Sequence, residues 1–410
     1  MGLAIRTGCM ISTSARRSCW VEKMTDGQHI FNDATALAFP RYPGTAGDAQ
    51  AISWLESRFQ EMGLETTLQW FTYDLGPAQR ALRVVLVASA MLVALAGIVT
   101  PRSPLSGLVL LVAAFLPGAI FLAWSPWLEK LYRREGGTRT ANVTGRRGVA
   151  EPRMTLILMA HHDSKSQSLS FPFRMGLTIS TIAGAILLAS LAVIAILSGN
   201  LPGPTWLPPS AGGATAVAAL VLSTMKSGDR SPGGVDNAGS VAIVLAVAKR
   251  LVDELPDDIE LIMLSTGAEE DHMVGAMRWL DVHADSLAPP VFCLNLDGAG
   301  APGRAVLIER YGFGRLFTSE MSSAARRASN RLGINPRGIV MLPGMGIDSI
   351  PFAHRGVPCL TLSSGSLGKA TMSVHSANDK AEHLDPETLA EIADLSFETL
   401  IELTDKASKE

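Results

Sequence analysis

The stretch LILMAHHDS, residues 156–164, changes from apolar to polar within one residue. Four large apolar residues in succession are typical of a buried strand. The strand ends in two histidines and an aspartate, which a protein interior does not hold without partners. Because ligands bind at the carboxyl ends of strands in open α/β sheets, this stretch predicts a functional site at the strand's end.

Other histidine and carboxylate residues lie at comparable places, after predicted strands or in glycine-rich and polar loops: Asp236, Glu269, Glu270, Asp297 and His375. Imidazoles and carboxylates together suit zinc, or manganese or cobalt at lower affinity. No cysteine belongs to the set, which argues against a closed structural zinc site. Even if only one of the two adjacent glutamates binds, two imidazoles and three carboxylates exceed the needs of one open tetrahedral ion, so the set favours two ions that share a carboxylate.

The polar part of the chain alternates between helix and strand patterns. Apolar residues at three-to-four spacing predict helices at 48–63, 240–255 and 317–333, and Asp385 is the predicted N-cap of a C-terminal helix. Buried strands are predicted at 67–73, 259–266, 290–297 and 357–362. This alternation predicts an α/β fold with a mostly parallel sheet.

Composition narrows the class of protein further. Net charge is −3 over 410 residues, so no basic surface for nucleic acid is predicted. The four cysteines have no metal-type spacing, and we interpret them as free thiols, which favours a reducing compartment. The N-terminal stretch has no apolar core of a signal peptide, and we predict a disordered tail there.

Long uncharged stretches predict a membrane-embedded part, because about 20 apolar residues are enough to cross a bilayer. We predict two transmembrane hairpins, formed by 82–100 with 105–127 and by 175–197 with 211–226. Trp124, Trp127 and Trp206 are placed where membrane interfaces enrich aromatic rings. The alternative is that these segments are buried helices of a soluble core.

Basic residues flank the hairpins unequally. The opposite loops carry only Arg102, whereas the segments on the side of the polar domain carry eight basic residues: Arg80, Arg83, Lys130, Arg133, Arg134, Arg174, Lys226 and Arg230. By the positive-inside rule, we expect the polar domain on the cytoplasmic side of a multi-pass integral membrane protein.

Five motifs in order resemble metallopeptidase family twenty-eight, the dizinc aminopeptidases with a phosphorylase/hydrolase-like α/β fold. They are AHHDS (160–164), GGVDNAGS (233–240), AEEDHMVGA (268–276), NLDGAG (295–300) and HSANDKAEHLDP (375–386). The resemblance covers nearly the whole chain apart from the tail and the hairpins. It implies a mixed sheet flanked by helices, with the two hairpins as insertions.

The resemblance also implies a ligand set for two zinc ions. Asp236 would bridge both ions, with His161 and Asp297 completing one shell and Glu270 and His375 the other. The implied activity is hydrolysis of N-terminal residues from a peptide substrate.

The resemblance also implies roles for two more residues. Glu269 would be the general base for the attacking water. Asp163 lies two residues beyond His161, points the same way on an extended chain, and would hydrogen-bond that imidazole.

Three single positions depart from the family pattern. His162 replaces a Tyr, and strand alternation directs it away from His161, so we interpret it as a packing or surface residue. His272 replaces a Gly and is expected to reshape the substrate pocket, and Ser376 replaces a Thr. Asp348 matches an acidic position, where a role in a substrate loop is a further hypothesis. The second hairpin falls between His161 and Asp236, so we expect the active site close to the bilayer surface.

The predicted organisation is a tail at 1–26, peptidase segments at 27–80, 129–174 and 227–410, and hairpins at 81–128 and 175–226. The predicted function is a membrane-bound, zinc-dependent exopeptidase. One alternative is an inactive peptidase-fold scaffold, and another is a single-zinc acyltransferase of the glutaminyl cyclase type. A transporter is disfavoured, because the predicted spans carry no internal charge.

Overall fold

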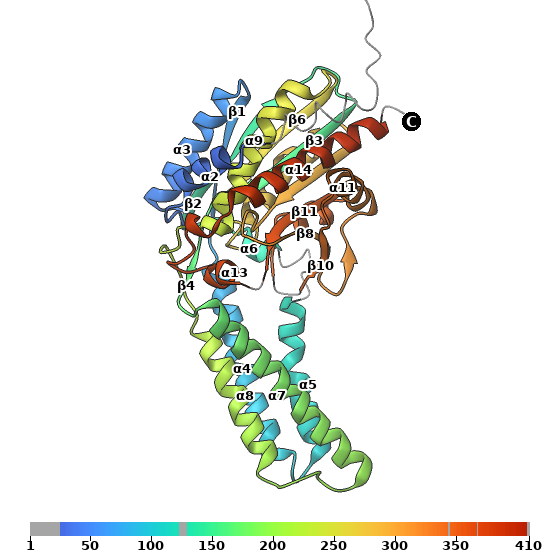
Figure 1. Cartoon of the computed structure of the whole chain (residues 1–410). Helices are drawn as coiled ribbons and strands as arrows, with labels where there is room; N and C mark the ends of the chain where they lie inside the picture. The colour runs from blue at the N-terminus through green and yellow to red at the C-terminus, as the bar shows by residue number, and fades with distance from the viewer. Residues whose placement is uncertain (1–24, 123–128, 343–344, 367, 408–410) are drawn as a thin grey trace, which may run out of the picture.

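The computed structural model describes residues 25–122, 129–342, 345–366 and 368–407. It shows an α/β body and a bundle of four helices that projects from one side of the body (Figure 1). Most of the predicted tail, together with Trp124 and Trp127, lies outside the described residues. Asp26 is described and caps the first described helix, accepting hydrogen bonds from the backbone N–H groups of Gln28 and His29.

The strands are β1 Glu65–Tyr73, β2 Thr138–Arg147, β3 Met154–His161, β4 Ser166–Gln167, β5 Ser227–Gly228, β6 Ile259–Thr266, β7 Val291–Leu296, β8 Arg304–Tyr311, β9 Arg315–Leu316, β10 Arg337–Met341 and β11 Cys359–Gly365. The helices of the body are α2 Gly27–Leu37, α3 Ala46–Glu61, α6 Glu129–Tyr132, α9 Gly239–Glu254, α10 Val274–His283, α11 Ser319–Leu332, α12 Ser349–His354, α13 Lys369–Ser373 and α14 Pro386–Ala407. Short helical turns are η1 Gly234–Ala238, η2 Ala284–Ser286 and η3 Ala381–His383.

The main sheet has the strand order β1-β2-β6-β3-β7-β11-β8-β10, with β9 paired to β8. The four central strands β6, β3, β7 and β11 run parallel. β1, β2 and β8 are antiparallel to their neighbours on the path towards the centre. The sheet is therefore mixed, and the predicted parallel arrangement holds for its centre.

Alternating side chains of β3 pack on both faces of the sheet. Leu156 and Leu158 lie in the core covered by α2, α3, α9, α11 and α14, whereas Ile157 and Met159 pack towards α10 and α12. All four are fully buried. A strand covered on both faces requires a continuous apolar run, which is the pattern of the sequence here.

The predicted elements are present with small shifts at their ends. IELIMLST forms β6 over the predicted residues 259–266. The helix predicted at 48–63 begins two residues earlier, because the Thr45 hydroxyl accepts a hydrogen bond from the Asp48 N–H and caps it. Asp385 caps α14 as predicted, accepting from the Thr388 N–H. Cys293 and Cys359 are buried free thiols, also as predicted.

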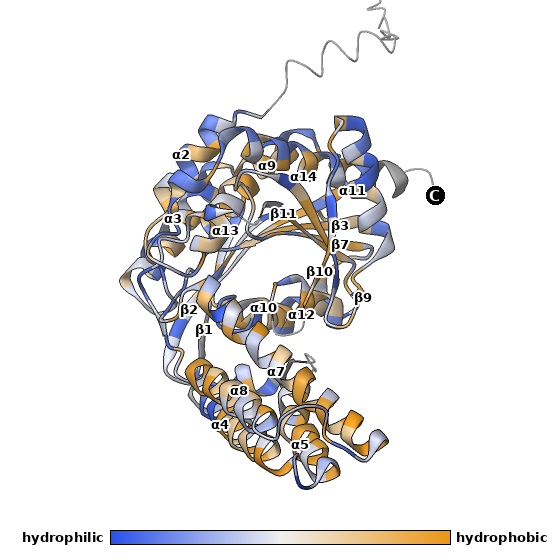
Figure 2. Ribbon diagram, turned by 60° about the horizontal axis from the view of Figure 1, so that its bottom comes forward, coloured by the Kyte–Doolittle hydropathy of each residue, from blue (hydrophilic) through white to orange (hydrophobic). Residues whose placement is uncertain are grey.

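The bundle consists of the helices α4 Gly76–Val99, α5 Pro104–Leu122, α7 Phe171–Ser198 and α8 Leu207–Ser223. By length and composition, α4 and α7 are each able to cross a membrane, whereas α5 and α8 are apolar but shorter. Only 22% of the most apolar window of α4 and of α7 is buried. A buried core helix would hide most of such a window, so these helices are not core helices of the body. Figure 2 shows that hydrophobic residues, coloured orange, are frequent along the four helices of the bundle.

Glycine allows the two hairpins to approach closely. A Cβ on Gly212 of α8 would lie 2.9 Å from the Val93 carbonyl oxygen and 3.0 Å from the Gly97 Cα of α4. Small residues at such crossings are the usual means by which helices pack in membranes. The two hairpins therefore form one unit, although 48 residues of sequence lie between the end of α5 at Leu122 and the start of α7 at Phe171.

Candidate metal centre

Three neighbouring parallel strands bring their carboxyl ends to one edge of the sheet. His161 is the last residue of β3, Asp297 follows β7 directly, and Glu269 and Glu270 lie in the loop after β6. The order β6-β3-β7 makes these groups spatial neighbours. Asp236 joins them from η1, before α9, and His375 from the loop after α13.

The five predicted ligands converge as two triads that share Asp236. One triad is His161, Asp236 and Asp297, and the other is Asp236, Glu270 and His375, with the potential ligand atoms of each triad within 4.8 Å of one another. The Nε2 atom of His161 lies 3.2 Å from Oδ1 of Asp236, and the Nε2 atom of His375 lies 3.2 Å from Oδ2. Each carboxylate oxygen of Asp236 therefore faces a different imidazole.

The remaining contacts complete the two triads. His375 Nε2 is 2.9 Å from Glu270 Oε2, and His161 Nε2 is 3.9 Å from Asp297 Oδ1. Glu269 belongs to neither triad, and its Oε2 atom is 3.8 Å from His161 Nε2. The geometry thus separates the two adjacent glutamates into one member of a triad and one neighbour of it.

The turn that carries Asp236 is held by a buried aspartate and a buried arginine. The carboxylate of Asp379 accepts hydrogen bonds from the backbone N–H groups of Val235 at 2.8 Å and Asp236 at 3.3 Å. The guanidinium of Arg41, which is fully buried, donates to the carbonyl oxygens of Pro232 and Gly233. Burial, reinforced by the Asp236 charge, raises the pKa of Asp379 to about 7.

Asp163 fixes the loop that carries the two glutamates. Its carboxylate accepts from the backbone N–H groups of Glu269 at 3.0 Å and Glu270 at 3.2 Å. One of its oxygens is also 3.5 Å from Nδ1 of His161, and the same Nδ1 lies 3.2 Å from the Asp163 carbonyl oxygen. Asp163 is therefore near His161 as expected, and it holds the glutamate loop in addition.

A second buried aspartate, Asp271, fixes the loop that carries Glu269 and Glu270. Asp271 accepts hydrogen bonds from the hydroxyl of Tyr73 at 2.7 Å and of Tyr42 at 2.9 Å. Lys165 adds a cation, with its Nζ atom 3.3 Å from Oε2 of Glu270 and in contact with the Glu270 carbonyl oxygen. The loop is therefore anchored by Tyr42 from the segment before α3, by Tyr73 from β1, and by Lys165 from the segment after β3.

The protonation of the site reflects its burial. Burial raises the pKa of Glu269 well above its usual range. Burial alone would lower the pKa of His375, but Glu270 and Asp236 raise it to about 9. Burial alone would raise the pKa of Asp236, but the neighbouring imidazoles of His161 and His375 lower it. Burial therefore sets the direction for Glu269, whereas the pairing of carboxylates with imidazoles sets it for His375 and Asp236.

The donor set fits metal ions. The buried Nε2 of His161 and Oε1 of Glu270 have no hydrogen-bond partner among the described residues, and the Nε2 atom of His161 lies 3.2 Å from the Asp236 carboxylate. Buried polar atoms without partners are rare and call for an explanation such as a bound ion. Imidazole nitrogens and carboxylate oxygens are also the ligands that zinc takes in catalytic sites. The residues present therefore fit two such ions.

Three other predicted positions can now be placed. His162 is fully buried and directed away from the triads, with its Nδ1 atom 3.1 Å from the Ser265 hydroxyl, so of the two interpretations packing is confirmed. His272 stacks on Tyr132, with ring centroids 4.2 Å apart, and has φ of +71° where the family pattern has glycine. Asp348 is fully buried and accepts a hydrogen bond from the Thr266 hydroxyl, and a role in a substrate loop stays a hypothesis. It directly precedes α12, which packs against β11.

Sequence reasoning missed the residues that hold the loops. Asp379 lies in HSANDKAEHLDP, four residues after His375, and its place in that motif was the available signal. Arg41 and Lys165 had no comparable signal, because an isolated basic residue in a sequence is most often a solvated surface group. Their roles follow from contacts between distant segments.

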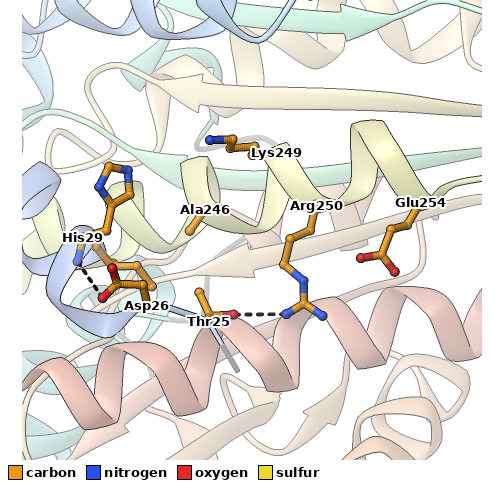
Figure 3. Close-up of a pocket in the computed structure, with 8 residues that line it drawn as sticks. Thr25, Asp26, His29, Ala246, Lys249, Arg250 and Glu254 are labelled. Carbon is orange, nitrogen blue, oxygen red and sulfur yellow. Dashed lines mark hydrogen bonds between the residues drawn. The ribbon is translucent and has the colours of Figure 1, made fainter. Parts of the chain in front are cut away.

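A surface pocket lies on another side of the body, between the start of α2 and α9 (Figure 3). Its polar side chains interact within the protein: Arg250 donates to Thr25 at 3.0 Å and to Asp394 at 2.7 Å. The pocket is lined by none of the five candidate ligands. Its side chains join α2, α9 and α14, which is a structural role.

Comparison with known proteins agrees with this arrangement. The family model of Peptidase family M28 matches residues 214–400, a region that contains Asp236, Glu269, Glu270, Asp297 and His375. His161 and Asp163 precede the matched region, so their assignment depends on the geometry. The chain is therefore similar to Peptidase family M28 over the part of the sequence that carries four of the five candidate ligands.

Individual relatives are distant. Aminopeptidase YwaD of Bacillus subtilis (strain 168) is 23% identical over 189 residues, which are 44% of this chain and 39% of that protein. Among solved structures, a zinc aminopeptidase from Bacillus subtilis superimposes with a TM-score of 0.56 at 14% identity, covering 93% of this chain and 96% of that chain. Porphyromonas gingivalis glutaminyl cyclase superimposes with a TM-score of 0.53 at 13% identity, covering 93% and 99%. These superpositions establish the fold.

Proposed function

We propose that the protein is a membrane-bound zinc exopeptidase that removes N-terminal residues from peptides. The observation that carries the proposal is the pair of triads that share Asp236, with one oxygen directed to each imidazole. His161 and Asp297 would hold one ion, Glu270 and His375 the other, and Asp236 would bridge them. The M28 match and the aminopeptidase relatives support this choice of reaction.

When bound, two such ions lower the pKa of water and polarise the scissile carbonyl. Glu269 would take the proton from the attacking water, because its carboxylate lies beside the triads without belonging to either. Its raised pKa matches a base that must release the proton to the leaving amine in the next step. Asp163 would keep Glu269 and Glu270 in place through their backbone N–H groups.

We also propose that the bundle spans a lipid bilayer and that the body lies on the cytoplasmic side. The large apolar side chains exposed along the bundle support a lipid environment, among them Val84, Met91, Val109, Ile186 and Leu197. A soluble surface rarely exposes so large a continuous apolar area. The excess of basic residues on the body's side of the helices supports the cytoplasmic orientation.

The test compares Glu269→Gln with Glu270→Gln in kcat and in bound zinc. Gln retains the shape of Glu but cannot take up a proton, so Glu269→Gln should lower kcat on aminoacyl-arylamides by about 10²–10⁴-fold and keep its metal. Glu270→Gln should instead lose zinc. Near-normal turnover of Glu269→Gln, or loss of metal from that variant alone, would refute these roles.

The glutaminyl cyclase neighbour supports a second candidate, a single-zinc acyltransferase. Hydrolysis is favoured, because both triads are complete, and this completeness also argues against an inactive scaffold. The two reactions are distinguished by a peptide with N-terminal Gln. An aminopeptidase releases free Gln from it, whereas a cyclase converts it to a pyroglutamyl peptide of unchanged length.

A further inference from the structure

His375 is held by a segment that belongs to the root of the second hairpin. Gln167 of β4 makes two contacts with it: the Gln167 backbone N–H donates to the His375 carbonyl oxygen at 2.9 Å, and the Gln167 side-chain Oε1 lies 3.2 Å from Nδ1 of the imidazole. His375 has φ of +60°, a left-handed conformation that non-glycine residues seldom adopt. A histidine in this conformation needs support from its surroundings, and Gln167 provides it from two sides.

The side-chain contact also selects the form of the imidazole. An amide oxygen can only accept, so Nδ1 must carry a hydrogen, and Nε2 is the nitrogen whose lone pair a metal ion would take. Nε2 is the atom that faces Asp236 and Glu270. A hydrogen bond at one ring nitrogen thus makes the other available to a metal ion, and such partners typically change metal affinity about 10–100-fold.

A second group from the hairpin competes for the same nitrogen. A guanidinium nitrogen of Arg174, in the first turn of α7, lies 3.5 Å from Nδ1. A guanidinium can only donate, which would place the hydrogen on Nε2 and block its lone pair. The shorter contact is that of Gln167, so the arrangement favours the metal-binding form.

The segment that carries Gln167 connects the body to the bundle. β4 pairs with β5 in a two-stranded ribbon, with Gln167 opposite Ser227. The ribbon is closed further by Ser168, whose N–H donates to the Lys226 carbonyl oxygen and whose hydroxyl accepts from the Lys226 N–H. The chain enters α7 three residues after this ribbon and leaves α8 three residues before it.

We propose that Gln167 is a positioning residue for the metal centre: it orients His375 and selects the tautomer that binds the second ion. The root of the second hairpin thereby sets the affinity of one of the two metal positions. The inference rests on the proposed metal centre and adds to it a residue that the family's motifs do not contain.

The experiment measures the two zinc dissociation constants of the full chain in detergent by competition with a chromogenic chelator. Gln167→Met removes the acceptor at similar volume and keeps the backbone contact, so it should weaken one ion about 10–100-fold and leave the other unchanged. Gln167→Glu keeps an acceptor and should retain both ions. Ser168→Ala is the matched control, because it removes a ribbon hydrogen bond without touching His375.

Each outcome decides the inference. Binding of both ions by Gln167→Met within twofold of wild type would overturn it, and so would equal weakening of both ions, which would indicate collapse of the ribbon. A wild type that binds a single ion would refute the dizinc proposal separately. In that case the ion must be weakened by both His375→Ala and Gln167→Met, and independence from either substitution would overturn the inference.

Discussion

The body and the bundle are both rich in apolar residues, but they place them in opposite ways. Leu156 and Ile157 of the central strand β3 are fully buried, whereas Leu197 of α7 is 82% exposed and Val84 of α4 is 68% exposed. The body's apolar residues face each other across a sheet, and the charges of the site lie where the strands end. The bundle's helices turn apolar side chains outward. The difference is the one that the proposed topology requires, with water around the body and lipid around the bundle.

The largest effect is expected in the topology of the chain. Reporters fused in the loop at Asn200 and in the loop at Arg102 should both report the side opposite the body, because both loops join helices at the far end of the bundle. Reporters in the exposed loop at Glu151 and at the C-terminus should report the cytoplasmic side. The four positions are read with paired reporters that are active on one side only.

Two patterns would contradict this topology. A signal at Asn200 from the same side as the C-terminus would show that α7 and α8 do not span. A complete reversal would place the body outside, and the basic residues of the helix ends would then not control orientation.

The stability of the body should depend on the ionisation of one buried carboxyl group. Burial raises the pKa of Asp348 to about 7, from an unfolded value of about 4. Between these values the folded state keeps a proton that the unfolded state releases. The protonated carboxyl therefore stabilises the folded state fully below about pH 4. The free energy of unfolding then falls by about 1.4 kcal/mol per pH unit as the pH rises to about 7.

Asp348→Asn tests this sign. The variant cannot ionise, so the melting temperature of its metal-free form should fall less than that of wild type as the pH rises from about 4 to about 7. Thermal unfolding is followed in detergent after treatment with a chelator. Parallel pH profiles of the two proteins would show that Asp348 does not titrate in the folded state in this range.

The stability of the bundle should depend instead on side-chain volume at the contact between α4 and α8. Gly212→Leu places a side chain where the backbone of α4 already lies within 3.0 Å, and overpacking of this kind costs about 1–3 kcal/mol. Gly213→Leu is the matched control on the same helix, because a Cβ there meets nothing within 4 Å. Only Gly212→Leu should lower the temperature at which the detergent-solubilised bundle unfolds. Equal effects of both substitutions would mean that helix propensity, and not packing, decides.

The sequence predicts the body well because its signals are local. The apolar run of β6 and the caps Thr45 and Asp385 operate within a few residues, so element positions follow from them. The antiparallel flanks of the sheet depend on which strands meet, and neither β1 nor β8 carries that information in its own pattern. Helix α2 was missed for a similar reason, since a capping Asp26 has to be distinguished from the tail before it.

The candidate site also shows that local sequence signals do not predict contacts between distant segments. His161, Glu270 and Asp297 could be predicted together, because parallel strands end at a common edge. The burial of Asp348 could not be predicted, because a motif position does not reveal whether its side chain faces solvent or the interior. Gln167 could not be predicted at all, since its contact with His375 joins segments that are 208 residues apart.

Metal content of purified protein tests the central claim most directly. The account predicts two zinc ions per chain in wild type, loss of both in Asp236→Ala, and retention of both in His162→Ala, because Asp236 faces both imidazoles and His162 faces Ser265. Elemental analysis after reconstitution gives the three values side by side. One ion or none in wild type, or loss of metal from His162→Ala, would contradict the account.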